Sequence, residues 1–155
     1  METKGPLMRN LKPLRIAVIV LLALLALQFE LGMAVNLSPN LKEVPPVGVA
    51  DLWKVIASVG EDALAHAVLR IVLVAAAVVG LVLSLLARAA SVSVIGVIAF
   101  LGTTVAAVNG VLFTLSGFKN DGYSHGMATG FLVAFTLWFV QVCLVSARLR
   151  GQGTP

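Results

Sequence analysis

The chain has 155 residues, of which 59% are hydrophobic and 12% are charged, and its mean hydropathy is +1.03. A soluble domain is nearer half apolar and a quarter charged, so this composition excludes a soluble enzyme and indicates that the bilayer is the solvent for most of the chain. The formal net charge of +4 and the pI near 9.7 would also suit a nucleic-acid-binding protein, so the positions of the charges must decide between the two.

Four apolar stretches are long enough to cross a membrane, because a bilayer core about 30 Å thick needs roughly 20 helical residues. Only a tight turn around Arg88 separates the second stretch from the third, which makes them an antiparallel hairpin. The sequence therefore predicts an all-α integral membrane protein, with one membrane domain over residues 1–155 that forms an antiparallel four-helix bundle. The predicted transmembrane helices cover residues 14–35, 63–87, 90–115 and 125–147.

The loop between the first two predicted helices, residues 36–62, is long for so small a protein. Its first half contains the pair Pro45 and Pro46, which resists helix formation. Its second half repeats apolar residues at helical spacing, and Trp53 is one of them. This pattern predicts a short amphipathic helix on the outer membrane surface, anchored by Trp53. The other apolar positions are Val49, Leu52, Val55, Ile56 and Val59.

Lysine and arginine residues are divided unequally between the two ends of the predicted bundle. Cytoplasmic loops are the ones enriched in these residues, so the bias predicts a multi-pass protein of the cell membrane with both termini in the cytoplasm. Membrane lipid headgroups, and not nucleic acid, are then the expected partners of the basic residues. The end with the termini holds Lys4, Arg9, Lys12, Arg15, Arg88, Arg148 and Arg150, whereas the opposite loops hold Lys42, Lys54 and Lys119.

The two histidines of the chain, His66 and His125, each lie near the start of a predicted helix that runs inward from the outer face. We therefore expect both at a similar depth in the outer leaflet. Two imidazoles from two helices of a bundle can serve as axial ligands of one heme iron, and ionisable residues within a membrane are functional candidates. The alternative is that each histidine is an interfacial polar residue that touches headgroups; the matched depth favours heme.

Gly126 and Gly130 follow His125 at a spacing of four residues and form a small helix face. Such a face can admit either a porphyrin or the backbone of a neighbouring helix, so both cofactor binding and helix packing are open at these positions. Asn109 and Gln141 are expected to form hydrogen bonds between helices.

Arg70 lies one turn inward from His66 on the same helix face, and Glu30 lies inside the outer end of the first predicted helix. Counted at about 1.5 Å per residue, both are roughly 9 Å below the outer boundary, where a lone charge costs about 2.5–3.5 kcal/mol. The opposite charges suggest an ion pair, or a contact between Arg70 and a heme propionate.

Two acidic residues, Glu61 and Asp62, precede His66. Asp62 is four residues before His66 and shares its helix face, so its carboxylate is a candidate for orienting the imidazole or for acid–base catalysis. The alternative is a solvated helix start, where acidic residues complement the helix dipole. Glu61, Asp62 and Glu30 are the candidate acidic catalytic residues.

These features together resemble one four-helix half of heme A synthase, and most closely the compact, half-length archaeal variants of that family. In the family an amphipathic outer loop follows the first helix, and one histidine opens the second helix and another the fourth. The matching stretches are residues 61–66 (EDALAH) with Arg70, and residues 109–113 (NGVLF) through 125–128 (HGMA).

The resemblance implies a membrane oxidoreductase that oxidises the C8 methyl of heme O to the formyl of heme A for terminal oxidase assembly. It implies heme B, heme O or heme A as cofactor and heme substrate. The family works with two hemes, whereas this chain offers one histidine pair, so a homo-oligomer is expected. Heme O synthase or a terminal oxidase would be its protein partner. Two other functions stay open: a b-type cytochrome in quinol-linked electron transfer, and a non-catalytic accessory subunit of a membrane complex.

Overall fold

The protein is an all-α bundle in the computed structural model, which describes residues 6–37 and 44–151. Four of its helices are long and apolar enough to cross a membrane, which confirms the predicted four-span architecture. The long helices are α1 (Pro6–Asn36), α3 (Glu61–Leu86), α4 (Ala90–Leu115) and α5 (Asp121–Gly151), and a short 3-10 turn, η2 (Val49–Asp51), leads into α2 (Leu52–Val59).

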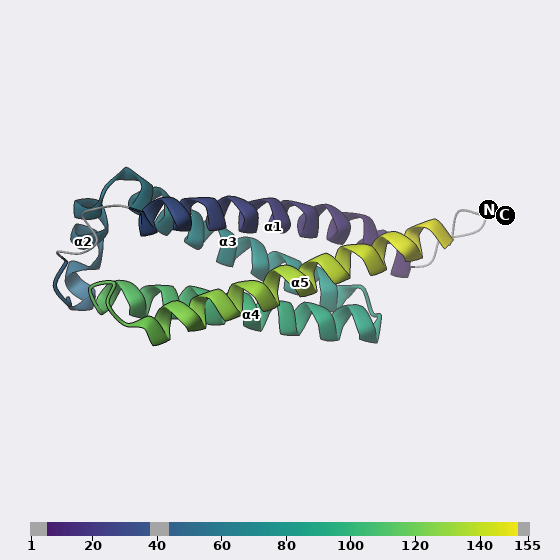
Figure 1. The fold of residues 1–155 in the computed structure, drawn as a ribbon. Helices are drawn as coiled ribbons and strands as arrows, with labels where there is room; N and C mark the ends of the chain where they lie inside the picture. Colours follow the sequence, from purple (N-terminus) through teal and green to yellow (C-terminus); the bar gives the residue numbers. More distant parts are fainter. Residues whose placement is uncertain (1–5, 38–43, 152–155) are drawn as a thin grey trace.

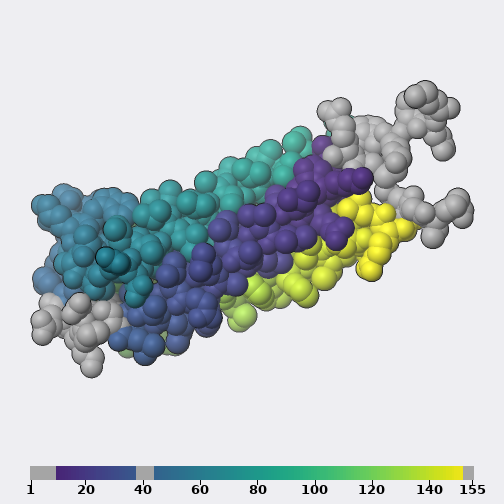
Figure 2. All heavy atoms as spheres, turned by 90° about the horizontal axis from the view of Figure 1, so that it is seen from above, coloured from purple at the N-terminus to yellow at the C-terminus, as the bar shows by residue number. Residues whose placement is uncertain are grey.

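The four long helices run antiparallel in chain order (Figure 1), and their contacts close them into a ring. Helix α1 packs against α3 and α5, and α4 packs against the same two neighbours. In the space-filling view, α1 lies between α3 and α5 along one face of the molecule (Figure 2). Helices α1 and α5 extend beyond the predicted spans, because their polar ends continue the helix past the apolar stretch.

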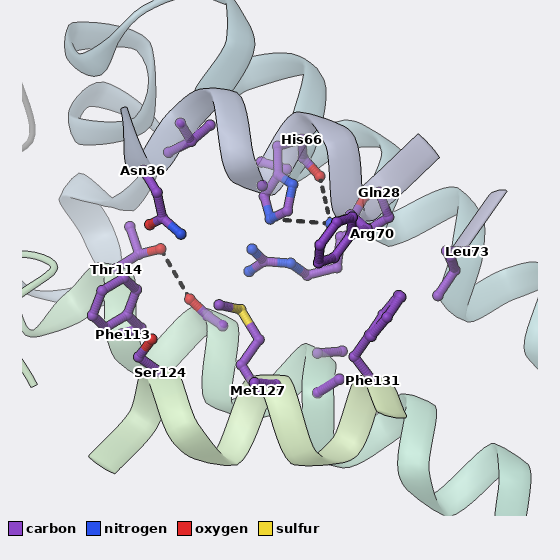
Figure 3. A pocket seen from close by; sticks show the side chains of 18 of the residues that line it. Gln28, Asn36, His66, Arg70, Leu73, Phe113, Thr114, Ser124, Met127 and Phe131 are labelled. Atoms are coloured by element: carbon purple, nitrogen blue, oxygen red, sulfur yellow. Dashed lines mark hydrogen bonds between the residues drawn. The ribbon is translucent and has the colours of Figure 1, made fainter. Parts of the chain in front are cut away.

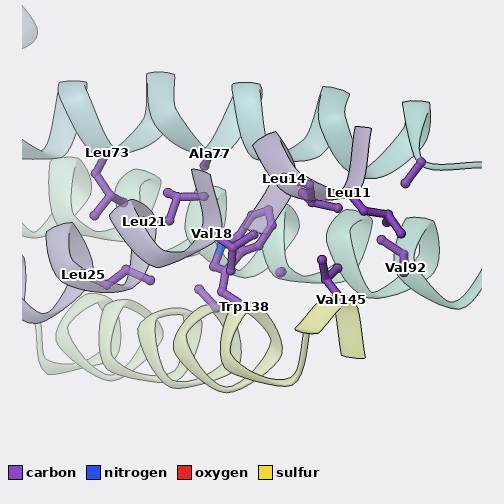
Figure 4. Packing of buried hydrophobic residues seen from close by; sticks show 13 residues of the cluster. Leu11, Leu14, Val18, Leu21, Leu25, Leu73, Ala77, Val92, Trp138 and Val145 are labelled. Carbon is purple, nitrogen blue, oxygen red and sulfur yellow. The ribbon is translucent and has the colours of Figure 1, made fainter. Parts of the chain in front are cut away.

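The half of the bundle near the Arg88 turn, which we call the inner half after the predicted topology, is tightly packed around Trp138 (Figure 4). The Trp138 ring is fully buried beside Val18 and Leu21 of α1, and its Nε1 donates to Thr103 Oγ1 at 3.3 Å. Gln141 Nε2 donates to Ser84 Oγ of α3 at 2.6 Å and to Val92 O of α4 at 3.1 Å, which confirms the predicted interhelical role of Gln141.

The opposite end of the bundle, which is the outer end in the predicted topology, holds an apolar group that we call the outer cap. The predicted amphipathic helix is present as α2, with Trp53 about half exposed. Gly60 joins α2 to α3 at φ 137°, a conformation that glycine adopts without steric cost. The loop is also tied to α4, because Val47 N donates to Leu115 O at 3.0 Å. The outer cap consists of Val35, Val44, Ile56, Val59, Ala63 and Ala67.

The start of α1 and the end of α5 lie together at the end of the bundle opposite α2 (Figure 1). This agrees with the predicted even number of spans. Lys4 and Lys42, which enter the charge balance, lie outside the described residues.

Candidate functional site

A cavity of about 460 Å³ lies inside the outer half of the bundle, between α1, α3, α4 and α5. Its walls consist mainly of alanine, leucine and phenylalanine side chains. His66 and Arg70 project into it from α3, and Gln28 projects from α1 (Figure 3). The cavity is therefore an apolar chamber with a few polar groups, the usual character of a small-molecule site.

The His66 imidazole is held against α1. Gln28 Nε2 lies 3.1 Å from His66 Nε2 and donates to the His66 carbonyl oxygen at 3.2 Å. A Cβ on Gly32 would lie 3.2 Å from His66 Cε1, so the glycine leaves room for the flat ring. His66 Nδ1 is buried and has no hydrogen-bond partner among the described residues.

The tautomer of a neutral His66 follows from the Gln28 amide. Since the amide nitrogen faces a carbonyl oxygen, which only accepts, that end of the amide must be the NH2 group. The NH2 group donates one hydrogen to the His66 carbonyl oxygen and the other to ring Nε2, so Nε2 must be a hydrogen-bond acceptor. The ring proton therefore lies on Nδ1, and Nε2 carries the lone pair that a metal would use.

The Arg70 guanidinium crosses the cavity from α3 to α4. A Cβ on Gly110 would lie 2.8 Å from Arg70 Cζ and 2.9 Å from Nη1, so this glycine leaves the space that the guanidinium occupies. Among the described residues, no aspartate or glutamate lines the cavity and no carboxylate forms an ion pair with Arg70. The chamber thus holds a cation whose charge no described residue compensates.

The second histidine lies elsewhere. His125 is exposed on α5 and is not part of the cavity lining, although Ser124 and Met127 beside it are. Within one chain the structure brings His66 together with Arg70, and it does not bring His66 together with His125.

Gly126 and Gly130 face α4 instead of the cavity. A Cβ on Gly130 would lie 2.6 Å from the backbone nitrogen of Ala106, and one on Gly126 would lie 2.5 Å from Asn109 Oδ1. The sequence left two roles open for this small face, cofactor binding and helix packing, and the structure shows helix packing. Asn109 Nδ2 donates to Val105 O of its own helix at 2.9 Å, so its expected bond to another helix is not formed.

The three candidate acidic residues stand outside the cavity. Glu61 and Asp62 are exposed in the first turn of α3. Glu30 is exposed on α1 and is not a lining residue, and the suggested ion pair between Glu30 and Arg70 is not formed.

Gln28 is the site residue that sequence reasoning missed. A glutamine well inside an apolar span is a signal in itself, because an uncharged amide in a membrane needs a hydrogen-bonding partner. The sequence does not say which helix provides that partner.

Comparison with known proteins assigns no family to the chain. No protein-family model matches it, and no curated protein or solved structure is significantly similar to it. Function must therefore be inferred from the site itself.

The residues of the site limit the cofactors that it can hold. The described residues contain no group of three or more His, Cys, Asp or Glu side chains that could hold a bare metal ion. A heme iron makes a smaller demand, because the porphyrin supplies its equatorial ligands and the protein needs to supply only one or two axial ones. His66 meets that smaller demand.

Proposed function

We propose that this protein binds heme in the cavity of its outer half and acts as a membrane oxidoreductase of the heme A synthase type. The observation that carries the proposal is the meeting of His66 and Arg70 in one apolar chamber that no carboxylate of the described residues lines. A lone arginine at membrane depth costs about 2.5–3.5 kcal/mol, and an anionic ligand group would offset that cost. Heme suits both residues, because its iron binds an imidazole ligand and its negatively charged propionates pair with a cation.

The residues present fit such a group. The volume of about 460 Å³ falls within the range of about 300–1,000 Å³ that is usual for ligand sites. His66 would hold the iron, Arg70 would neutralise a propionate, and the phenylalanines of the wall would cover the porphyrin faces. The described residues in the lining supply one imidazole, so one axial ligand per cavity is what the chain supports.

His125 then has a different place in the proposal. Because it is exposed on α5, it is available to a neighbouring copy and not to the cavity of its own chain. This is compatible with the expected homo-oligomer, in which a second copy would complete the site. Bis-imidazole ligation within a single chain would require α5 to rotate about its axis.

Heme, when bound, supplies the electron-transfer and oxygen chemistry that oxidation of a methyl group requires. The chain's own residues bind and orient. His66 would hold the iron, Arg70 would pair with a carboxylate, and the apolar walls would keep water from the macrocycle. The acidic residues do not line the cavity, so no proton transfer by Glu30, Glu61 or Asp62 is derived.

Heme binding is tested by the absorption spectrum of the purified protein and of three variants. We expect heme absorption in the natural protein, its loss in His66→Ala, and about tenfold weaker binding in Arg70→Met, equivalent to about 1.4 kcal/mol. Lys54→Met is the matched control, because Lys54 is an exposed cation paired with Asp51 outside the cavity. A normal spectrum in His66→Ala would refute the proposed ligand.

The reaction is tested by coexpression with a source of heme O and analysis of the extracted hemes. Conversion to heme A is the expected result. If the protein binds heme but does not convert heme O to heme A, its function would instead be the electron transfer of a b-type cytochrome. A protein that contains no heme at all would leave an accessory subunit as the function.

A further inference from the structure

The exposed residues of the cavity lining are confined to two of the four helices. The α1 side contributes Phe29 and Met33, which are 51% and 45% exposed, together with Asn36 at the helix end. The α5 side contributes Ala128 and Leu132, and Leu132 is 63% exposed. Every lining residue of α3 and α4 is buried or half-buried. The cavity therefore reaches the molecular surface between α1 and α5.

The two ends of the cavity are closed by apolar packing. At the outer end Ile56 of the outer cap covers the chamber, with Phe118 packed against the cap. At the inner end Leu25 and Leu73 line the chamber and belong to the tightly packed core around Trp138. Apart from Asn36 at the end of α1, the exposed lining residues therefore lie on the side of the bundle, where lipid chains lie.

Aromatic rings line this lateral opening. Phe29 of α1 stacks on Phe131 of α5 with ring centroids 5.6 Å apart and an interplanar angle of 27°. Phe131 stacks in turn on Phe135 at 5.9 Å and 24°. Side chains that meet across a gap between two helices can separate by rotamer changes, and flat apolar faces suit a flat ligand.

We infer that the cavity loads from the outer leaflet through the gap between α1 and α5, and that Phe29 and Phe131 form its gate. The ligand is a flat tetrapyrrole dissolved in the membrane, whose carboxylate is drawn inward by Arg70. The inference rests on the proposed function, since it takes heme as the occupant. It adds the route by which heme enters the cavity. It also requires that the molecule that donates heme releases it into the lipid of the membrane.

The gate is tested by bridging it. In a Cys143→Ser background, Phe29→Cys and Phe131→Cys are combined and joined with a short bis-maleimide, because Cys143 is exposed and would also react. Phosphatidylcholine vesicles loaded with hemin serve as the donor, and heme uptake is followed by absorption. The same double variant without reagent, and treated with a single-ended maleimide, gives the reference rates.

We expect bridging to slow uptake by about tenfold or more, which corresponds to a barrier raised by at least about 1.4 kcal/mol. Bridging after loading should trap the heme and slow its release by a similar factor. A bridge that merely filled the cavity would expel the heme instead, and that result would overturn the inference.

Failure of the gate and failure of the proposed function give different results. Equal uptake by bridged and unbridged protein would place the route elsewhere while heme binding stands. No uptake by any form, the background included, would refute both. If the double variant does not fold, Met33→Trp with Leu132→Trp narrows the same opening; it should slow both the uptake and the release of heme, and unchanged rates would place the route elsewhere.

Discussion

Gln28 and an iron would compete for the same nitrogen of His66. That nitrogen, Nε2, lies 3.1 Å from Gln28 Nε2, and Nδ1 has no partner in the described segments. In the neutral tautomer inferred above, Nε2 accepts from the amide and Nδ1 carries the proton. Ligation through Nε2 would displace the amide and leave the imidazole otherwise in place. Gln28 thus stabilises the His66 position seen here, and the proposed heme binding would have to replace that hydrogen bond.

Replacing Gln28 with leucine should therefore separate stability from affinity. Gln28→Leu should lower the stability of the heme-free protein by about 1–2 kcal/mol, because its hydrogen bonds to His66 Nε2 and to the His66 carbonyl oxygen are both lost. It should tighten heme binding by about fivefold, which is equivalent to about 1 kcal/mol for the one bond that competes with the iron. Thermal unfolding in detergent and heme titration measure the two quantities. Weaker heme binding would mean that Gln28 supports the bound state.

Gln141→Leu is the matched control for this variant. Gln141 Nε2 also donates two hydrogen bonds from one helix to its neighbours, but it does so in the inner core. Its replacement should reduce stability and leave the heme affinity of the folded protein unchanged.

Neighbouring residues on one helix can have opposite roles here, and the sequence does not reveal which role each has. Gln28 faces the cavity whereas Glu30, two positions later, is exposed. His125 is exposed whereas Gly126 packs on α4. Each residue step turns a helix by about 100°, so residue counting predicts depth but not direction. In a soluble helix the polar residues show which face is exposed to water. In a membrane helix the lipid-facing residues are as apolar as those of the core, so the sequence does not show which face is exposed.

At the scale of elements, α4 and α5 meet more closely than ordinary side chains would allow. A Cβ on Gly102 would lie 2.9 Å from the backbone nitrogen of Ala134, and Gly130 is similarly close to Ala106. Small residues let helix backbones approach in a membrane, where no hydrophobic effect drives helices together. This glycine contact fixes α5 and thereby sets which of its residues line the cavity.

Gly130→Ala should destabilise the protein by about 1–3 kcal/mol, because the new methyl group meets backbone that must shift. Gly126→Ala should cost less, since its obstacle is the Asn109 side-chain amide, which can change rotamer. Gly151→Ala, at a position with nothing within 4 Å, is the control. Thermal unfolding of the three variants in detergent gives the comparison; equal losses at Gly126 and Gly130 would contradict it.

The elements themselves were largely predictable because their signals are local. Apolar length predicted all four long helices, and the repeat from Val49 to Val59 predicted α2. His66 and Arg70 were correctly placed on one face because they lie one turn apart on one helix. The cavity was not predictable, because it depends on how four uniformly apolar helices rotate against one another.

At the scale of the whole molecule, the bundle is packed in one half and hollow in the other. The solid half contains Trp138 and lies toward the end with the termini, while the chamber lies toward α2. The leaflet in which the proposed heme site lies therefore depends on which way the bundle is inserted.

Orientation is the last prediction, and it follows from the charges. By sequence, the segments at the end with the termini hold seven Lys and Arg residues and the opposite loops hold three, and cytoplasmic segments carry the excess of such residues. A reporter fused at the C-terminus should therefore be cytoplasmic, and one inserted near Asn120 should be external. The matched control adds lysines to the loop near Asn120, which should weaken or reverse the bias. An external C-terminus in the natural protein would place the chamber in the inner leaflet, and heme would then be delivered from the cytoplasmic side.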